Sequence, residues 1–274
     1  MRRWLFLAAM AGVGCSRAEA PARVEVGIEA PSYAARDLKG ELHRLWRMTE
    51  EAAVSRVRDL MATRPVIIAD GHHRYETAVA YAERHPDARH KLMAFFTLEA
   101  PGLTILPNHR LVHDIKGFDF EDFVQMASRW FDVSPLDDPS TVELENRSIA
   151  VVSGPDAALL RLKPGARDHI AWPERRSAAW RGLAVSILHE GLLRPLLDIT
   201  DAKLDAKTHV DYTADRAEAI KLAREGQCQA AFLIAPTTAE ELQAVVRGGE
   251  LLPQKSTHFY PKLLDGLVFY RLGE

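Results

Sequence analysis

The stretch Val66–His85, VIIADGHHRYETAVAYAERH, carries the strongest fold signal in this 274-residue chain. Its first four residues form a continuous apolar run, which is typical of a buried strand. The spacing from Arg74 to Arg84 predicts a helix that ends at His85-Pro86, because a proline disfavours helical backbone in the residue before it. Asp70, Gly71, His72 and His73 stand between the two elements. We therefore expect a strand, a tight turn and a helix that begins with polar side chains.

The rest of the chain mixes both kinds of element. Apolar residues at helical spacing predict helices, and short apolar or alternating runs predict strands. Thr237–Glu240 is interpreted as a capping box for the helix that follows it. These patterns predict an α/β or α+β fold with a mixed sheet flanked by helices. Strands are expected at 41–48, 91–98, 148–152, 158–162, 208–213, 229–235 and 267–271, and helices at 50–62, 118–131, 178–197, 214–226 and 241–249.

Composition narrows the function classes. Hydrophobic residues make up 47% of the chain and charged residues 27%, which is typical of a globular protein. The net charge of −3 gives no overall basic field, and this argues against nucleic acid as a partner. Only Cys15 and Cys228 are present, so no disulfide framework is expected. Beyond the first residues, no apolar stretch is long enough to predict a transmembrane domain.

The first 20 residues, MRRWLFLAAMAGVGCSRAEA, have the layout of a secretory signal peptide. Arg2 and Arg3 precede an apolar run from Trp4 to Val13, and Gly14-Cys15 loosely resembles a lipoprotein attachment site. The alternatives are an apolar N-terminal helix and an incorrectly chosen start.

The Asp-Gly-His-His-Arg junction favours an anionic ligand. A helix N-terminus presents unpaired N–H groups and the positive end of the helix dipole, where cationic side chains are unfavourable unless an anion joins them. A phosphate would bind the N–H groups and the fork of Arg74 together. A metal site is disfavoured, because His72 and His73 point in different directions on a helix. The structural alternative is that Asp70 caps the helix, the histidines pack and Arg74 pairs with a surface acid.

The same residues resemble the nucleotide-binding signature of the ParB/sulfiredoxin superfamily, and in particular the Asp-Gly-His-x-Arg run of free-serine kinases. Gly71, His73, Arg74 and Tyr75 match that signature, and Asp70 matches its kinase-like version. The resemblance implies that His73 and Arg74 hold nucleotide phosphates. His72 occupies the position of the sulfiredoxin catalytic cysteine. Since histidine cannot form a sulfur-linked intermediate, sulfinic acid reduction is excluded.

A longer resemblance joins four motifs in order: IIADGHHRYETA, LPNHRLVHDI, AAFLIAP and LLPQKSTHFYPKLLDGLVFY. Together they are similar to domain-of-unknown-function family 1015, from about Gly40 to the C-terminus. Members of that family carry well over a hundred further residues before ELHRLW, where this chain has its signal-like leader. The departure implies a truncated chain, which a homo-oligomer or another partner would cover on the shortened side. It also shifts the expected location towards the cytoplasm, with export or lipoprotein attachment as the alternative.

Three regions are then expected. Residues 1–22 form the signal-like or spurious leader, residues 23–135 form a partial ParB/sulfiredoxin-like region with the DGHHR motif, and residues 136–274 form a C-terminal α+β region. The LPQKSTHFYPK loop of the last region offers Lys255, Ser256, Thr257 and Lys262 as groups for a phosphate or carboxylate.

A second motif, Pro107–Asp114, brings two histidines and an arginine together in a predicted strand. Alternation would place His109 and His113 on one face, where they could join His73 in a pocket. Arg110 and Asp114 would lie on the other face, where an exposed salt bridge is one interpretation. We favour structural or supporting roles for all of them.

The sequence therefore predicts a protein that binds a nucleotide or phosphorylated metabolite, with kinase-like transfer to a small molecule as the most concrete version. The cofactor would be ATP or ADP with Mg²⁺, and no dedicated metal site is expected. Gly71, His72, His73, Arg74, Tyr75, Lys255, Ser256 and Thr257 would bind it, and Asp70 would be the catalytic base or a Mg²⁺ partner. The alternative is a non-catalytic ParB-like binding module or an inactive, truncated family member.

Overall fold

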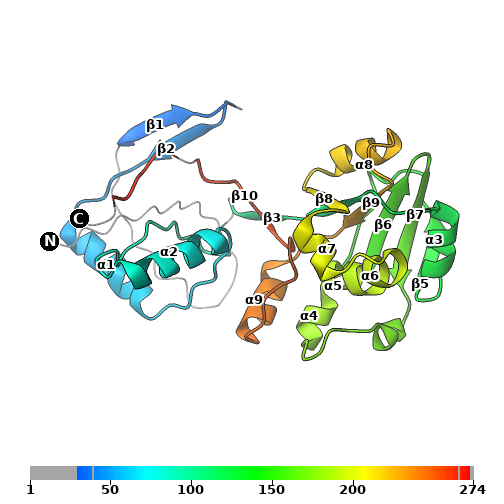
Figure 1. Ribbon diagram of the computed structural model, residues 1–274. Helices are drawn as coiled ribbons and strands as arrows, with labels where there is room; N and C mark the ends of the chain where they lie inside the picture. Colours follow the sequence, from blue (N-terminus) through cyan, green and yellow to red (C-terminus); the bar gives the residue numbers. More distant parts are fainter. Residues whose placement is uncertain (1–29, 39, 101, 265, 272–274) are drawn as a thin grey trace, which may run out of the picture. The chain divides into compact units, whose positions relative to one another are not determined.

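The computed structural model describes residues 30–271 except 39, 101 and 265 (Figure 1). The signal-like leader therefore lies outside the described residues. Contacts divide the chain into two compact units: unit 1 comprises 1–104 with 261–274, and unit 2 comprises 105–260. The regional boundary expected near residue 135 falls inside unit 2, directly after a strand. Each unit is described by itself below.

Unit 2 is built on a six-stranded sheet in the order β5-β7-β6-β9-β4-β8. All five pairs of neighbouring strands in this sheet are antiparallel. The central strands β6 and β9 read SIAVVS and AAFLI, and such continuous apolar runs suit strands that are covered on both faces. The strands are β4 (His109–Val112), β5 (Phe131–Pro135), β6 (Ser148–Ser153), β7 (Asp156–Leu162), β8 (Val210–Thr213) and β9 (Ala230–Ile234).

Helices cover both faces of this sheet (Figure 1). Alternate strand residues point to opposite faces, so Val151 packs in one apolar cluster and Val152 in the other. The smaller cluster includes Ala219 and Ala223 of α8 (Arg216–Arg224). The larger cluster takes residues from the remaining helical segments: α3 (Phe120–Ala127), α4 (Ala178–Gly182), α5 (Ala184–Leu188), a π-helical turn (His189–Leu193), α6 (Arg194–Leu197), α7 (Asp201–Ala206) and α9 (Ala239–Arg247).

Three shorter features complete unit 2. A 3₁₀ turn, η1, spans Ala166–His169. The strand β3 (Thr104–Leu106), which begins at the unit boundary, pairs with β10 (His258–Tyr260). The capping box of α9 is formed by Thr238 and Glu241, one residue later than the sequence suggested.

Unit 1 contains the antiparallel hairpin of β1 (Tyr33–Arg36) and β2 (Leu42–Leu45), together with the helices α1 (Glu51–Ala62) and α2 (His72–Arg84). The expected helix after the DGHHR motif is therefore confirmed. Of the apolar residues buried in the described structure, only Ala53 belongs to this unit.

The prediction of a buried strand before the motif is wrong. Residues 66–69 form no strand, and Val66 and Ile68 are 58% and 50% exposed. Residues 91–98 and 267–271 also lack the expected strands. A strand exists only where another segment completes its hydrogen-bond ladder, and an apolar run of this length carries no information about such a partner.

The fold class itself is confirmed: the protein is α+β, with antiparallel sheets flanked by helices. Among the helices that the structure describes, none combines the length and apolar character needed to cross a bilayer.

Candidate functional site

The start of α2 is an open helix N-terminus. The helix begins at His72, after Gly71 in the left-handed conformation with φ 80°. It has no side-chain cap and no acidic residue in its first turn. An uncapped N-terminus leaves backbone N–H groups and the positive end of the dipole to interact with whatever approaches. The interpretation of Asp70 as the cap of this helix is therefore wrong.

Asp70 instead bonds locally and lies between two cations. Its Oδ1 accepts a hydrogen bond of 2.9 Å from the N–H of Gly71. Its Oδ2 lies 3.6 Å from Nη2 of Arg74 and 3.5 Å from Nζ of Lys262. The Asp70 side chain is 59% exposed, so both ion pairs are solvent-screened and weak. Another anion can therefore replace the Asp70 carboxylate beside these two cations at little cost in free energy.

Gly71 is favoured here by its backbone conformation. A residue with a side chain is strained at φ 80°. A Cβ at this position would also lie 3.0 Å from both Nε and Nη2 of Arg74. The guanidinium group of Arg74 therefore folds back over Gly71, next to the helix N-terminus. The side chain of Arg74 therefore occupies the space next to the backbone of Gly71.

The two histidines lie side by side at the first turn. Their ring centroids are 4.0 Å apart, and Nδ1 of His73 lies 3.6 Å from Oε2 of Glu76. The His73 side chain is 85% exposed, and Tyr75 is also exposed. Among the described residues, one group has side chains close enough together to hold a metal ion, and it includes neither His72 nor His73. Lys91 adds a further cation nearby, because its Nζ donates to the carbonyl of Arg74 at 2.8 Å.

The LPQKSTHFYPK loop is divided between the units. Lys262 lies in unit 1 beside Asp70, whereas Lys255, Ser256 and Thr257 lie in unit 2. Ser256 is buried, and its hydroxyl donates to the carbonyl of Pro253 at 2.5 Å. The structure thus brings together Asp70, Gly71, Arg74 and Lys262, and the ligand-binding role of Lys255–Thr257 stays a prediction. Lys262 belongs to the loop expected from the sequence, but no motif or spacing in the sequence indicates its pairing with Asp70.

Arg110 holds the other part of this loop in place. The interpretation of Arg110 as part of an exposed salt bridge is wrong, because its side chain is fully buried. The guanidinium group donates to the carbonyl oxygens of Asn108, Gln254 and Lys255, the last two at 3.3 and 3.1 Å. Burial lowers its pKa to about 10. Burial, followed by the charge of Arg110, also holds the pKa of His189 well below its usual range.

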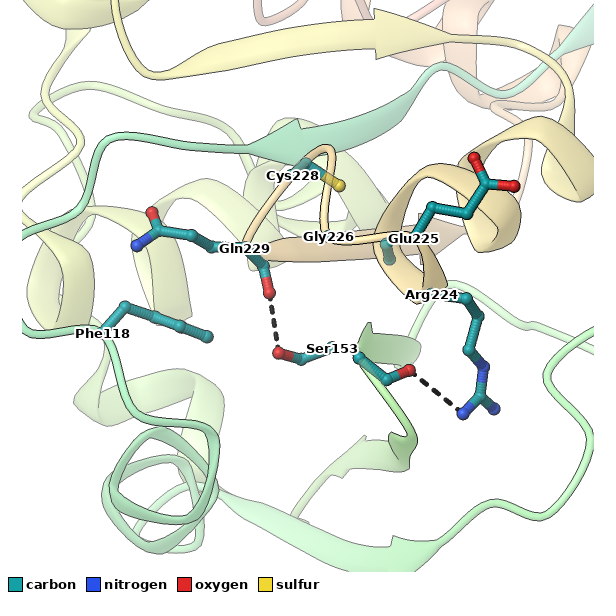
Figure 2. Close-up of a pocket in the computed structure, with 9 residues that line it drawn as sticks. Phe118, Ser153, Arg224, Glu225, Gly226, Cys228 and Gln229 are labelled. Atoms are coloured by element: carbon teal, nitrogen blue, oxygen red, sulfur yellow. Dashed lines mark hydrogen bonds between the residues drawn. The ribbon is translucent and has the colours of Figure 1, made fainter.

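A cavity of about 470 Å³ lies elsewhere in unit 2, between the ends of β6 and α8 (Figure 2). Its polar side chains are already engaged. Ser153 donates to the carbonyl of Gln229, and Arg224 donates to that of Gly154. Burial raises the pKa of the Cys228 thiol to about 11, which keeps it protonated and unreactive. This cavity therefore offers no reactive group, and the α2 N-terminus is the better candidate.

Comparison with known proteins gives one family. The model described as "Protein of unknown function (DUF1015)" matches residues 19–186. The match confirms the resemblance found in the sequence motifs, although it starts earlier than Gly40 and ends before the LPQKSTHFYPK loop. The comparison with curated proteins gave no match.

Three solved structures illustrate the structural likenesses. A conserved hypothetical protein from Pyrococcus furiosus is 16% identical, with a TM-score of 0.40, and the match covers 70% of this chain and 68% of that one. A free serine kinase in complex with AMP is 14% identical, with a TM-score of 0.41 and coverage of 78% and 81%. A mutant free serine kinase in complex with ADP is 15% identical, with a TM-score of 0.38 and coverage of 70% and 66%. Values this low do not establish a common fold.

Proposed function

The chain belongs to the DUF1015 family, whose description states no function, so we propose its function from the α2 site: it binds the phosphate of a nucleotide or phosphorylated metabolite there. One observation carries this proposal. An uncapped helix N-terminus lies beside two cations, Arg74 and Lys262, whose shared counter-ion is the exposed carboxylate of Asp70. An incoming phosphate would replace that carboxylate as the counter-ion.

The exchange is energetically reasonable. Each exposed ion pair to Asp70 contributes roughly 0–1 kcal/mol. A phosphate would instead receive two parallel hydrogen bonds from Arg74, and charge-assisted bonds of this kind contribute about 1.5–3 kcal/mol each. Backbone N–H groups at the start of α2 would donate to the same oxygens. Lys262 would add a positive charge, and the exposed ring of His73 would offer a further hydrogen-bonding group.

Kinase-like transfer is the most specific form of the proposal. The phosphate would release Asp70 from Arg74, and the freed carboxylate could take the proton from a substrate hydroxyl. The hydroxyl oxygen would then bond to the terminal phosphorus of ATP, and ADP would leave with the electrons of the broken P–O bond. Mg²⁺ would arrive with the nucleotide, since the two cations beside Asp70 make it a poor resident metal ligand.

Binding is tested by isothermal titration and thermal shift with ATP, ADP, CTP, GTP and inorganic phosphate, each with Mg²⁺. We expect Arg74→Ala to weaken phosphate-ligand affinity at least about tenfold, since one charge-assisted contact is of this size. The matched control is Arg84→Ala at the other end of the same helix, where affinity should not change. The proposal fails if no phosphate ligand binds, or if both variants bind as tightly as the wild type.

Asp70→Asn separates catalysis from binding. The amide keeps the shape of the carboxylate but cannot accept a proton at neutral pH. In the kinase-like form, the variant still binds ATP, while phosphorylation of an amino-acid or sugar panel, followed by mass spectrometry, is lost. Binding without product in the wild type would instead identify a non-catalytic binding module.

A further inference from the structure

The tip of the β1–β2 hairpin gathers three potential metal ligands on one face. Asp37 follows β1 directly and Glu41 precedes β2 directly. The register pairs Arg36 with Leu42, so Asp37 and Glu41 stand opposite each other in the next cross-strand position. His43 lies two residues beyond Glu41, and alternation places it on the same side. One short hairpin therefore presents two carboxylates and an imidazole together.

The turn fixes the first two of these residues. The N–H of Gly40 donates to the carbonyl of Asp37 at 3.0 Å, and Gly40 adopts a positive φ of 83°. This is the geometry of a hairpin loop closed by a left-handed glycine. The N–H of Glu41 donates to Oδ1 of Asp37 at 2.9 Å, and Oδ2 of Asp37 contacts the ring of His43. The adjacent cation, Arg36, donates to the carbonyl of Gly40.

The side-chain geometry suits a shared ion. One ligand atom from each of Asp37, Glu41 and His43 lies within 4.8 Å of the other two. Nε2 of His43 is 3.1 Å from Oδ2 of Asp37, and both side chains are partly buried, with exposed fractions of 21% and 18%, whereas Glu41 is exposed. Two ligand atoms bound to one ion at about 2.1 Å are separated by this distance when they subtend roughly a right angle. A metal ion would thus take the place of the hydrogen atom in the His43–Asp37 hydrogen bond.

The hairpin also has a need for such an ion. In the described structure β1 and β2 form a sheet of only two strands. An isolated two-stranded hairpin is marginally stable in water. A metal ion bound by residues on both strands would close the turn and contribute its binding free energy to the folded hairpin.

We propose that Asp37, Glu41 and His43 bind one divalent transition-metal ion of the zinc class, which fastens the β1–β2 hairpin. One nitrogen and two carboxylate ligands match the preference of Zn²⁺ for mixed nitrogen and oxygen sites, and the two carboxylates neutralise its charge. With three protein ligands, the remaining coordination position belongs to water. The inference is independent of the phosphate site at α2.

The test is metal titration of the tag-free, chelator-treated full chain. Zn²⁺ binding is followed by calorimetry, and Co²⁺ is used as a spectroscopic probe because its visible absorption reports coordination. We expect one equivalent of tightly bound metal, with Mg²⁺ unable to compete. His43→Ala and Glu41→Gln should each weaken Zn²⁺ affinity at least about tenfold. His85→Ala, in the same unit but outside the hairpin, is the matched control for the 11 histidines of the chain.

Glu41→Gln keeps the size of the side chain, so circular dichroism should show an unchanged fold and its affinity loss should reflect the lost ligand alone. An absence of stoichiometric Zn²⁺ binding would overturn the proposal and leave the Asp37–His43 contact as a hydrogen bond within the hairpin. Equal Zn²⁺ affinity in the two hairpin variants and in His85→Ala would also overturn it, since the ion would then be bound elsewhere.

Discussion

Units 1 and 2 differ in how they bury apolar residues. Helix α5 of unit 2 is buried at all five of its positions, whereas α2 of unit 1, with 13 residues, has none that is buried. The sheet of unit 2 is covered on both faces, and its two apolar clusters account for most of the buried core of the described residues. In unit 1, Tyr75, Val79 and Tyr81 of α2 remain exposed by about two fifths.

This difference separates the residues that stabilise the fold from the residues proposed to bind a ligand. Unit 2 contains the apolar burial that stabilises a fold, at about 25 cal/mol per Å². The candidate phosphate site lies in unit 1, on a helix whose polar contacts include that of Lys91 with the carbonyl of Arg74. Residues that bind an anion must stay accessible, so an exposed, uncapped helix start suits binding better than it suits stability.

The largest expected effect comes from the core of unit 2. Phe232 is fully buried and packs edge-on against Phe123, with ring centroids 5.5 Å apart. Phe232→Ala should lower the free energy of unfolding by about 3–5 kcal/mol, because it removes a buried aromatic ring and leaves a cavity. Val79→Ala on α2, at a position 44% exposed, should change the free energy by less than about 0.5 kcal/mol.

Guanidinium unfolding followed by tryptophan fluorescence measures both changes. Trp130, Trp172 and Trp180 report on unit 2, and Trp46 reports on unit 1. Replacing both Trp4 and Trp46 with phenylalanine therefore leaves only the tryptophans of unit 2 as reporters. A Val79→Ala effect as large as that of Phe232→Ala would show that α2 is buried against something, and the contrast between the units would be lost.

The same contrast explains which features the sequence could predict. Helix α2, its glycine and its cationic first turn are local signals, and they were predicted correctly. The capping box of α9 was displaced by one residue, because Thr237 and Thr238 offer the same hydroxyl at adjacent positions. The strand expected at 66–69 was wrong, since a strand depends on a partner that the run itself does not specify.

Contacts between distant residues account for the rest. Lys262 reaches Asp70 from the opposite end of the chain, and no spacing rule connects such positions. Arg110 looked like a surface cation because its partners are backbone carbonyls more than 140 residues away, at Gln254 and Lys255. Carbonyl oxygens are present at every residue, so a sequence gives no sign of which ones will satisfy a buried arginine.

The pH dependence of stability tests the effect of burying a histidine in unit 2. Burial, and then the charges of Arg216 and Arg110, lower the pKa of His109 from 6.5 to about 4. Its Nδ1 accepts a hydrogen bond of 3.3 Å from the N–H of Ile234, which only the neutral ring allows. The unfolded chain takes up a proton near pH 6.5 and the folded one only near pH 4. Stability is therefore full above pH 6.5 and falls between these values, by roughly 3 kcal/mol.

His109→Asn provides the matched variant, because its amide oxygen can accept from Ile234 without titrating. Between pH 6.5 and 4.5 the unfolding free energy of this variant should depend less on pH than that of the wild type. His189, with its lowered pKa, acts in the same direction and leaves a residual slope. An unchanged slope in His109→Asn, with His85→Asn as the control in unit 1, would show that His109 does not resist protonation.

The smallest effect compares two helix starts. In α9, Thr238 and Glu241 close the N-terminus with reciprocal hydrogen bonds of 3.2 and 2.9 Å, so Thr238→Ala should cost about 1 kcal/mol of unit 2 stability. In α2, Asp70 caps nothing, so Asp70→Ala should change stability by less than about 0.5 kcal/mol. It should also leave phosphate affinity unchanged or higher, because the anion then competes with no carboxylate for Arg74. Chemical denaturation and phosphate titration of both variants measure this. A loss of stability in Asp70→Ala equal to that in Thr238→Ala, with no gain in affinity, would make Asp70 a structural cap and would remove the reason to regard the start of α2 as open.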